Sequence, residues 1–252
     1  WYGFLFQDRG AVGRVPVLMP CRWEDGWPML GDAEGKVPLV MDVPVMGQKE
    51  TPLVISDQFD SDKLAINWQW NHNPDNELWS LTERPGYMRL KTGKVVETIF
   101  EARNMLSQRT EGPACRGVVA LDVSQMQDGD KAGLSAYCSE PGIISVQMEG
   151  DKKYLVMIDR DTEKERVELT QSVVYLRLDC DFNRGTDKAN FYYSLDNVEW
   201  TKLGTEFQMV YNLRHFMGNR FGIFNYATKA AGGYVDVDFF DYTRLCNGLS
   251  QQ

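Results

Sequence analysis

The chain has 252 residues, enough for one large β domain or for one domain with an appendage, and enough to bury a core without disulfide support. With 27 Lys and Arg against 36 Asp and Glu, its formal net charge at pH 7 is −9. This balance argues against nonspecific binding to nucleic acid or to an anionic membrane surface, and no apolar run approaches the roughly 20 residues of a membrane span.

The first thirty-one residues carry two short apolar segments, 1–6 and 14–19, separated by Gly10 and Gly13. A turn signal at 24–26 precedes Trp27. So short a piece cannot bury its own aromatic side chains, and it must dock on something larger. Residues 32–51 lack a helical or strand period and read as a linker, so we place the main domain at 52–246.

From residue 52 onward, short strand-like segments follow one another without a long amphipathic helix. This pattern predicts an all-β fold, a β-sandwich of jelly-roll type. The charged run 159–166 reads as a solvated hairpin tip, and Ser194–Trp200 as a tight hairpin whose Trp packs back. The expected strands are 99–105, 116–123, 133–138, 143–148, 153–158, 173–180, 189–194, 220–226 and 234–242.

Five cysteines are scattered along the chain, and none has the spacing of metal ligands. An odd count leaves at least one thiol free, which favours buried thiols in a reducing compartment. A bacterial cytoplasmic location is therefore favoured over a secreted one, although the compartment stays open. The chain begins at Trp1 without a signal-peptide pattern, so we expect its start to be a cut in a larger protein.

The stretch 68–87 is the most distinctive, because aromatic rings alternate there with amide, imidazole and charged groups. Such neighbours suit a sugar, whose C–H face stacks on a ring while its hydroxyls need donors and acceptors. The alternative is that the Trp residues are core, that the polar run is a turn and that the charged pair is structural. The candidate sugar-binding residues here are Trp68, Trp70, His72, Asn73, Trp79, Glu83 and Arg84.

Asn104 and Gln108 share one face of the expected next strand, where a polar row can line a concave sheet. A buried polar network is the competing explanation. Acidic residues near the start and end of the domain suit a structural Ca²⁺ ion, and no other cofactor is required. The calcium candidates are Asp57, Asp60, Asp236, Asp238 and Asp241.

Four segments resemble the concanavalin A-like C-terminal domain of family 43 glycoside hydrolases, the β-xylosidase and α-L-arabinofuranosidase group. They are Trp68–Tyr87, Ala102–Thr110, His215–Gly218 and Arg220–Thr228. Phe4–Arg14 and Asp25–Pro28 are similar to the last blade strands of that family's five-bladed propeller. The resemblance implies that 1–31 is a remnant of the catalytic domain and that the catalytic carboxylates lie upstream of Trp1. It also implies that the sandwich packs on the propeller and, in some members, lends a loop to the substrate pocket.

Three functions follow from these observations. The first is a non-catalytic module that binds xylan, arabinoxylan or xylooligosaccharides. The second is a structural module that packs on the catalytic propeller and completes its pocket. The third, a stand-alone xylan-active hydrolase or esterase, has the least support. Several acidic residues could pair, but the Glu-x-Asp-x-x-Glu pattern of sandwich glycosidases does not occur. A Ser-His-Asp system with His72 or His215 would need a Gly-x-Ser-x-Gly elbow, and the sequence has none.

Overall fold

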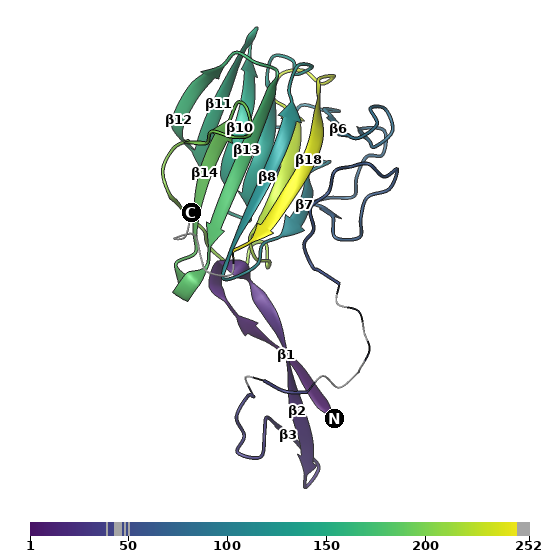
Figure 1. Cartoon of the computed structure of the whole chain (residues 1–252), viewed down its shortest axis with the longest axis vertical. Coiled ribbons are helices and arrows are strands. Elements are labelled where there is room, and N and C mark those ends of the chain that lie inside the picture. Colours follow the sequence, from purple (N-terminus) through teal and green to yellow (C-terminus); the bar gives the residue numbers. More distant parts are fainter. Residues whose placement is uncertain (39, 43–46, 48, 50, 246–252) are drawn as a thin grey trace.

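The computed structural model describes residues 1–38, 40–42, 47, 49 and 51–245. In this part of the chain, antiparallel strands form a three-stranded sheet and two larger sheets of seven and eight strands. Figure 1 shows the three-stranded sheet extending from one end of the sandwich that the larger sheets build. The predicted all-β sandwich is confirmed.

The small sheet, here called the N-terminal hairpin, is longer than the sequence predicts. It consists of β1 (Tyr2–Asp8), β2 (Arg14–Glu24) and β3 (Trp27–Leu30), with the 3₁₀ turn η1 (Gly10–Val12) between β1 and β2. The described part of 32–51 contains no helix or strand, and residues 39, 43–46, 48 and 50 lie outside the described residues. Assignment of the hairpin to a propeller blade stays a prediction.

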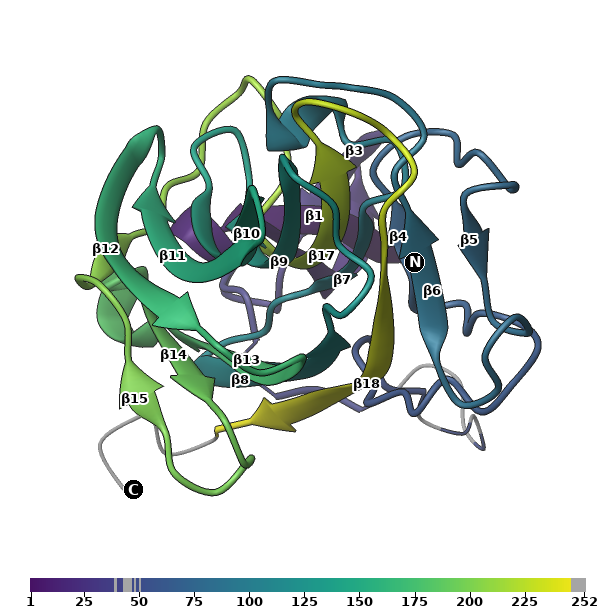
Figure 2. The same cartoon turned by 90° about the horizontal axis from the view of Figure 1, so that it is seen from above.

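The two larger sheets stack face to face, as Figure 2 shows from above. The seven-stranded sheet has the order β12-β11-β10-β9-β17-β7-β4. In this order, the strands span Thr162–Leu169, Lys152–Asp159, Gly142–Glu149, Asp130–Tyr137, Arg220–Ala227, Leu106–Arg109 and Gln69–Trp70. The eight-stranded sheet includes the order β15-β14-β13-β8-β18-β6-β5, and β16 (Phe207–Gln208) also pairs with β14. From β15 to β5 in this order, the strands span Thr201–Lys202, Lys188–Ser194, Val173–Asp181, Ala114–Asp122, Tyr234–Arg244, Met88–Lys91 and Trp79–Ser80.

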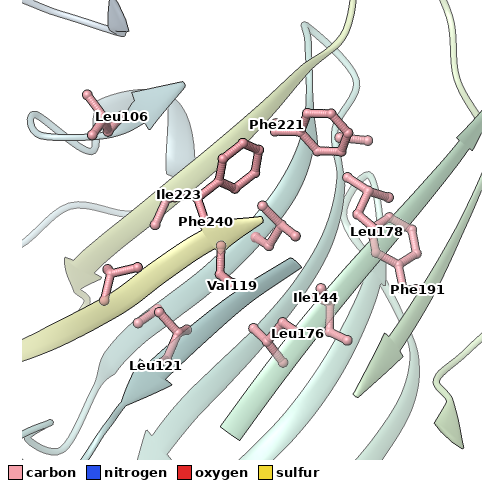
Figure 3. Close-up of a cluster of buried hydrophobic side chains, with 14 of the residues drawn as sticks. Leu106, Val119, Leu121, Ile144, Leu176, Leu178, Phe191, Phe221, Ile223 and Phe240 are labelled. Carbon is pink, nitrogen blue, oxygen red and sulfur yellow. The ribbon is translucent and has the colours of Figure 1, made fainter. Parts of the chain in front are cut away.

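The main core lies between the two sheets. Strand residues with a period of two point inward from both layers, and Figure 3 shows side chains such as Val119, Leu176, Phe221 and Phe240 meeting there. Each of these four is fully buried. Burial of this kind stabilises the fold by about 25 cal/mol per Å² of apolar area removed from water, which is why the sandwich needs no disulfide.

A second apolar cluster covers the outer face of the seven-stranded sheet. It includes Ile99, Met105, Tyr137 and Phe224. The strand predicted at 99–105 is wrong: the segment starts as the 3₁₀ turn η2 (Ile99–Glu101), and β7 begins only at Leu106. Thr98 and Glu101 form a capping box there, which favours a turn over extended backbone.

The charged run 159–166 does lie in a solvated hairpin, but most of it is strand rather than tip. The turn involves only 160 and 161, and Thr162 begins β12, an edge strand whose side chains are largely exposed. The predicted hairpin at Ser194–Trp200 is confirmed, since β14 and β15 pair around it. Its turn is not tight, because residues 195–200 separate the two strands, with Asn197 at a φ of 62°. Trp200 packs back against the guanidinium of Arg177, 5.6 Å from the ring centroid.

Cys21, Cys115, Cys138 and Cys180 are free thiols, the last three buried, whereas Cys246 lies outside the described residues. Across the residues with described placement, we find no helix with the length and apolar character that crossing a membrane requires.

A buried carboxyl makes stability depend on pH. Asp130 is fully buried, and its Oδ2 accepts a hydrogen bond from the Gln127 amide, whereas its Oδ1 has no partner among the described residues. Burial raises the pKa of Asp130 to about 6. The folded chain therefore holds this proton more tightly than the unfolded chain, so the carboxyl destabilises the fold by up to about 3 kcal/mol as pH rises from 4 to 7. We expect Asp130→Asn to lose this part of the pH dependence of the free energy of unfolding, which urea unfolding at several pH values measures. If the difference in unfolding free energy between the variant and the wild type is the same at pH 4 and pH 7, this expectation is contradicted.

Candidate functional site

Trp68 belongs to the core rather than to a sugar platform. Its side chain is 7 % exposed, stacks on Phe59 at 5.8 Å between ring centroids and meets Phe240 edge-on at 5.2 Å. The indole N–H donates to Asp57 Oδ2 at 2.8 Å, which satisfies the only polar atom of the ring. The proposal of Trp68 as a ligand contact is therefore corrected: no ring face is left for a sugar.

Trp70 and Trp79 are half-buried and pack on each other, with centroids 5.1 Å apart and planes tilted by 52°. The indole N–H of Trp79 donates to Asn76 Oδ1 at 3.0 Å. Both rings also pack against the main core, so each offers at most an edge to a ligand. These two remain sugar-binding candidates.

His72 and Asn73 are exposed at the tip of the same loop. His72 Nε2 lies 2.7 Å from the carbonyl oxygen of Phe100, so this nitrogen donates. The carbonyl of Asn73 accepts from Arg103 at 3.1 Å. These contacts tie residues 72–73 to η2 and to the segment that follows it, and they leave the side chain of Asn73 accessible.

Asn104 and Gln108 each bind both backbone groups, the N–H and the C=O, of one residue in another segment. Asn104 accepts from the amide of Asp75 and donates to its carbonyl, both at 2.9 Å. Gln108 makes the same pair of bonds to Ile55, both at 3.0 Å. Because the two side chains are 5 % and 0 % exposed, the buried polar network explains them and the concave sugar-binding row is wrong.

Glu83 and Arg84 belong to an ion network on the outer face of the eight-stranded sheet. Arg84 contacts Asp122 at 2.7 Å and Asp236 at 3.0 Å, and Arg89 binds Asp236 through both Nε and Nη2. Glu83 pairs with Lys91 at 2.5 Å, and this hydrogen bond lowers the pKa of Glu83. Glu83 and Arg84 thus form intramolecular ion pairs, which the sequence offered as the alternative to a sugar contact.

The five aspartates do not assemble a calcium site. Asp236 is held by two arginines, Asp57 accepts from Trp68, and Asp241 accepts from Gln58 at 3.1 Å. Burial raises the pKa of Asp238, and nearby Asp60 adds to this effect. Among the residues with described positions, no group of three or more His, Cys, Asp or Glu side chains could hold a metal ion.

Removal of calcium is therefore predicted to leave stability unchanged. A bound ion would stabilise the folded chain according to its concentration relative to its dissociation constant. We expect the same melting temperature with excess EDTA and with millimolar CaCl₂, measured by differential scanning calorimetry. A rise of several degrees on adding CaCl₂ contradicts this expectation.

A loop of residues 211–218, between β16 and β17, is held by the sandwich at its start and middle and by the N-terminal hairpin just after its end. His215 lies edge-on to Phe100 at 5.3 Å and 5.6 Å from Tyr137, on the outer face of the seven-stranded sheet. At the start of the loop, Asn212 Oδ1 accepts from Ser139 at 2.7 Å. After the loop, the amide of Asn219 donates to the carbonyl of Ala11, at 2.8 Å.

The N-terminal hairpin packs against the same loop. The guanidinium of Arg14 lies 4.4 Å from the ring centroids of both Phe6 and Phe216, so it is sandwiched between the hairpin and the loop. Gly13 and Gly218 bring the two backbones so close that a Cβ at Gly13 would lie 2.7 Å from the amide nitrogen of Gly218. Phe216 is still 59 % exposed, with a φ of 52° that non-glycine residues rarely adopt.

Beside this junction lies a cleft of about 1040 Å³, here called the arginine cleft. Its walls come from the hairpin (8–10, 12, 14–16), from the end of the sandwich (109–113, 182–185, 211, 216–220, 244) and from Leu53. Six arginines line it, against Asp8 and Glu111 as the acidic residues of this lining. The cleft is thus positively charged in a chain whose net charge is −9.

Sequence reasoning missed this cleft. Its arginines lie at positions 9, 14, 109, 184, 220 and 244, and only the fold brings them together. The one signal was the resemblance of Phe4–Arg14, His215–Gly218 and Arg220–Thr228 to segments of one family.

The comparisons with known proteins agree with this architecture. The family model described as the β-xylosidase C-terminal concanavalin A-like domain matches residues 56–243. A β-xylosidase from Formosa agariphila is 34 % identical over 258 residues, covering 91 % of this chain and 43 % of that protein. The chain spans less than half the length of this and several other curated relatives.

Two solved structures extend the match to nearly the whole chain. A bifunctional protein of family 43 from Bacteroides eggerthii is 46 % identical with a TM-score of 0.90, covering 98 % of this chain and 33 % of that chain. A family 43 glycoside hydrolase engineered to display both endo-xylanase and exo-arabinofuranosidase activity is 32 % identical with a TM-score of 0.88, covering 97 % and 52 %. The chain belongs to the family of C-terminal concanavalin A-like domains found in the β-xylosidases of glycoside hydrolase family 43.

Proposed function

We propose that this chain is the accessory part of a xylan-degrading family 43 enzyme, and that it packs on the catalytic propeller and completes its substrate pocket. The observation that carries this proposal is the aromatic surface of the N-terminal hairpin. Trp1, Phe4 and Trp27 are 84 %, 73 % and 74 % exposed there. Exposed apolar surface of this extent marks an interface with another folded unit.

The 211–218 loop supports a role at the pocket. The sandwich holds this loop through His215 and Asn212. The hairpin holds it through Arg14, and the Ala11 carbonyl accepts from the Asn219 amide just after the loop. Phe216 therefore sits on a rigid support but remains exposed at the junction with the hairpin. A rigid, exposed ring beside the docking surface is suited to line a pocket that belongs to the other domain.

Sedimentation velocity tests this docking. An equimolar mixture of the chain and the separately produced catalytic portion of the longer enzyme is expected to sediment as one complex. Trp27→Asp should weaken that complex at least about tenfold, because a buried Trp is a typical anchor of an interface. Val198→Asp, an equally exposed change at the β14–β15 turn, is the control and should have no effect. Two species that sediment independently would refute docking.

Binding of xylan or arabinoxylan by the sandwich itself is the second candidate, favoured by the half-buried Trp70–Trp79 pair. Affinity electrophoresis in xylan gels tests it: retardation of the wild-type chain that Trp70→Ala reduces would support the module. Unchanged mobility in soluble hemicelluloses would remove it. Independent hydrolysis has no observation in its favour, and we expect no reducing sugar to be released from xylan by this chain alone.

A further inference from the structure

Arg109 and Arg220 face each other at the edge of the arginine cleft. They are direct partners on the antiparallel strands β7 and β17. Their neighbours Gln108 and Phe221 are fully buried between the sheets, so both arginines lie on the outer face. Like charges in this arrangement repel across roughly 5 Å between Cβ atoms, so the pair destabilises the free fold.

The chain supplies little to neutralise this pair. Neither arginine forms an ion pair with any carboxylate whose position is described, and Arg220 donates to the neutral amide oxygen of Gln69. The two acidic residues of the cleft are engaged elsewhere: Asp8 accepts from the Gly10 amide and Glu111 from the Tyr242 hydroxyl. Burial, with a further contribution from Arg109, lowers the pKa of Arg220. An anion is the complement that this geometry lacks.

The rest of the cleft wall suits a polyhydroxylated ligand. Asn219 and Tyr211 belong to this wall, and neither Asn219 Oδ1 nor the Tyr211 hydroxyl has a hydrogen-bond partner among the described residues. Both atoms are covered in the free chain, so a ligand reaches them only if the wall opens slightly. Phe216 places an exposed ring in the same wall. Amide, hydroxyl and ring groups beside guanidinium groups match a sugar that carries a carboxylate, rather than a bare inorganic anion.

We propose that the arginine cleft binds a uronic acid unit of a xylan chain, with its carboxylate at Arg109 and Arg220. The sugar part of this inference rests on the proposed function, whereas the carboxylate part rests on the arginine pair alone. Planar guanidinium groups bind carboxylates through two parallel hydrogen bonds, so this site discriminates an acidic branch from a neutral one. The branched substrate is then held next to the loop that carries Phe216.

Isothermal titration calorimetry with this chain tests the proposal. The probes are xylotriose carrying one glucuronic acid branch, and unbranched xylotetraose as the neutral match. At low salt we expect the acidic oligosaccharide to bind at least about tenfold more tightly, as charge-assisted hydrogen bonds provide, and the difference to shrink in ~0.5 M NaCl. Free glucuronate should compete with the acidic probe.

Variants separate this site from general charge effects. R109Q/R220Q should lower the affinity for the acidic oligosaccharide to that of the neutral one, whereas Arg166→Gln on β12 changes a distant arginine and should leave both affinities unchanged. R109Q alone should not lower the melting temperature, because it relieves repulsion. Equal affinity of the wild type for both probes, or no binding of either, overturns the proposal. Sedimentation velocity measures docking on the catalytic portion independently. If the chain docks but shows no preference for the acidic oligosaccharide, the uronic acid proposal fails and the proposed function stands.

Discussion

Asp236→Ala is expected to destabilise the sandwich by about 3–5 kcal/mol, measured by urea unfolding at pH 7. The side chain of Asp236 is 4 % exposed and accepts from both Arg84 and Arg89. Its removal leaves the guanidinium of Arg89, itself only 16 % exposed, without its bidentate partner. Strands β18 and β6 pair at this point, so the loss acts on the junction of these two strands in the eight-stranded sheet.

Asp241→Ala is the matched control on the same strand. Asp241 is exposed and has one hydrogen bond, from the Gln58 amide, so its replacement should change stability by less than about 0.5 kcal/mol. If both variants unfold at the same urea concentration as the wild type, the ion network is not a structural element.

Gly218→Ala is expected to separate the 211–218 loop from the N-terminal hairpin. A Cβ at this position would overlap the carbonyl oxygen of Val12, a backbone atom that cannot rotate away as a side chain can. We expect a loss of about 3 kcal/mol or more in the free energy of unfolding, with the hairpin becoming sensitive to limited proteolysis first.

The sandwich provides the comparison for this variant. Its core strands should keep their protection in hydrogen exchange, because the three atoms nearest to the new methyl group are backbone atoms of Val12 and Gly13 in the hairpin. Wild-type proteolysis kinetics of the hairpin in Gly218→Ala would mean that the close approach of the two backbones does not hold the hairpin.

The fold was predictable wherever one side of a strand is buried against the other sheet. Strands such as β8, β13 and β17 carry apolar residues at the required period, and they are found close to the predicted ranges. β12 was missed because an edge strand with exposed side chains needs no apolar face. Residues 99–105 were misread because Ile99 and Met105 are buried in a cluster outside the sandwich core.

The candidate site was less predictable, for reasons that lie in the side chains themselves. The sequence cannot distinguish a Gln108 or Asn104 that binds a sugar from one that binds backbone groups. Their role depends on whether the backbone of Ile55 or Asp75 lies within hydrogen-bond distance, which only the fold determines. Aromatic residues as close in sequence as Trp68 and Trp70 still differ in burial. The arginine cleft depends on contacts between residues more than two hundred positions apart, so no local motif can reveal it.

The kinetics of the reconstituted enzyme test the central claim most directly. The catalytic portion of the longer enzyme is combined with wild-type chain, with Phe216→Ala, or with Leu213→Ala, an exposed residue of the same loop. If the hairpin and the 211–218 loop complete the pocket, Phe216→Ala lowers kcat/KM for xylobiose at least about tenfold without weakening the complex, and Leu213→Ala does not. Full activity of the catalytic portion without this chain, or equal activity with all three forms, would contradict the account.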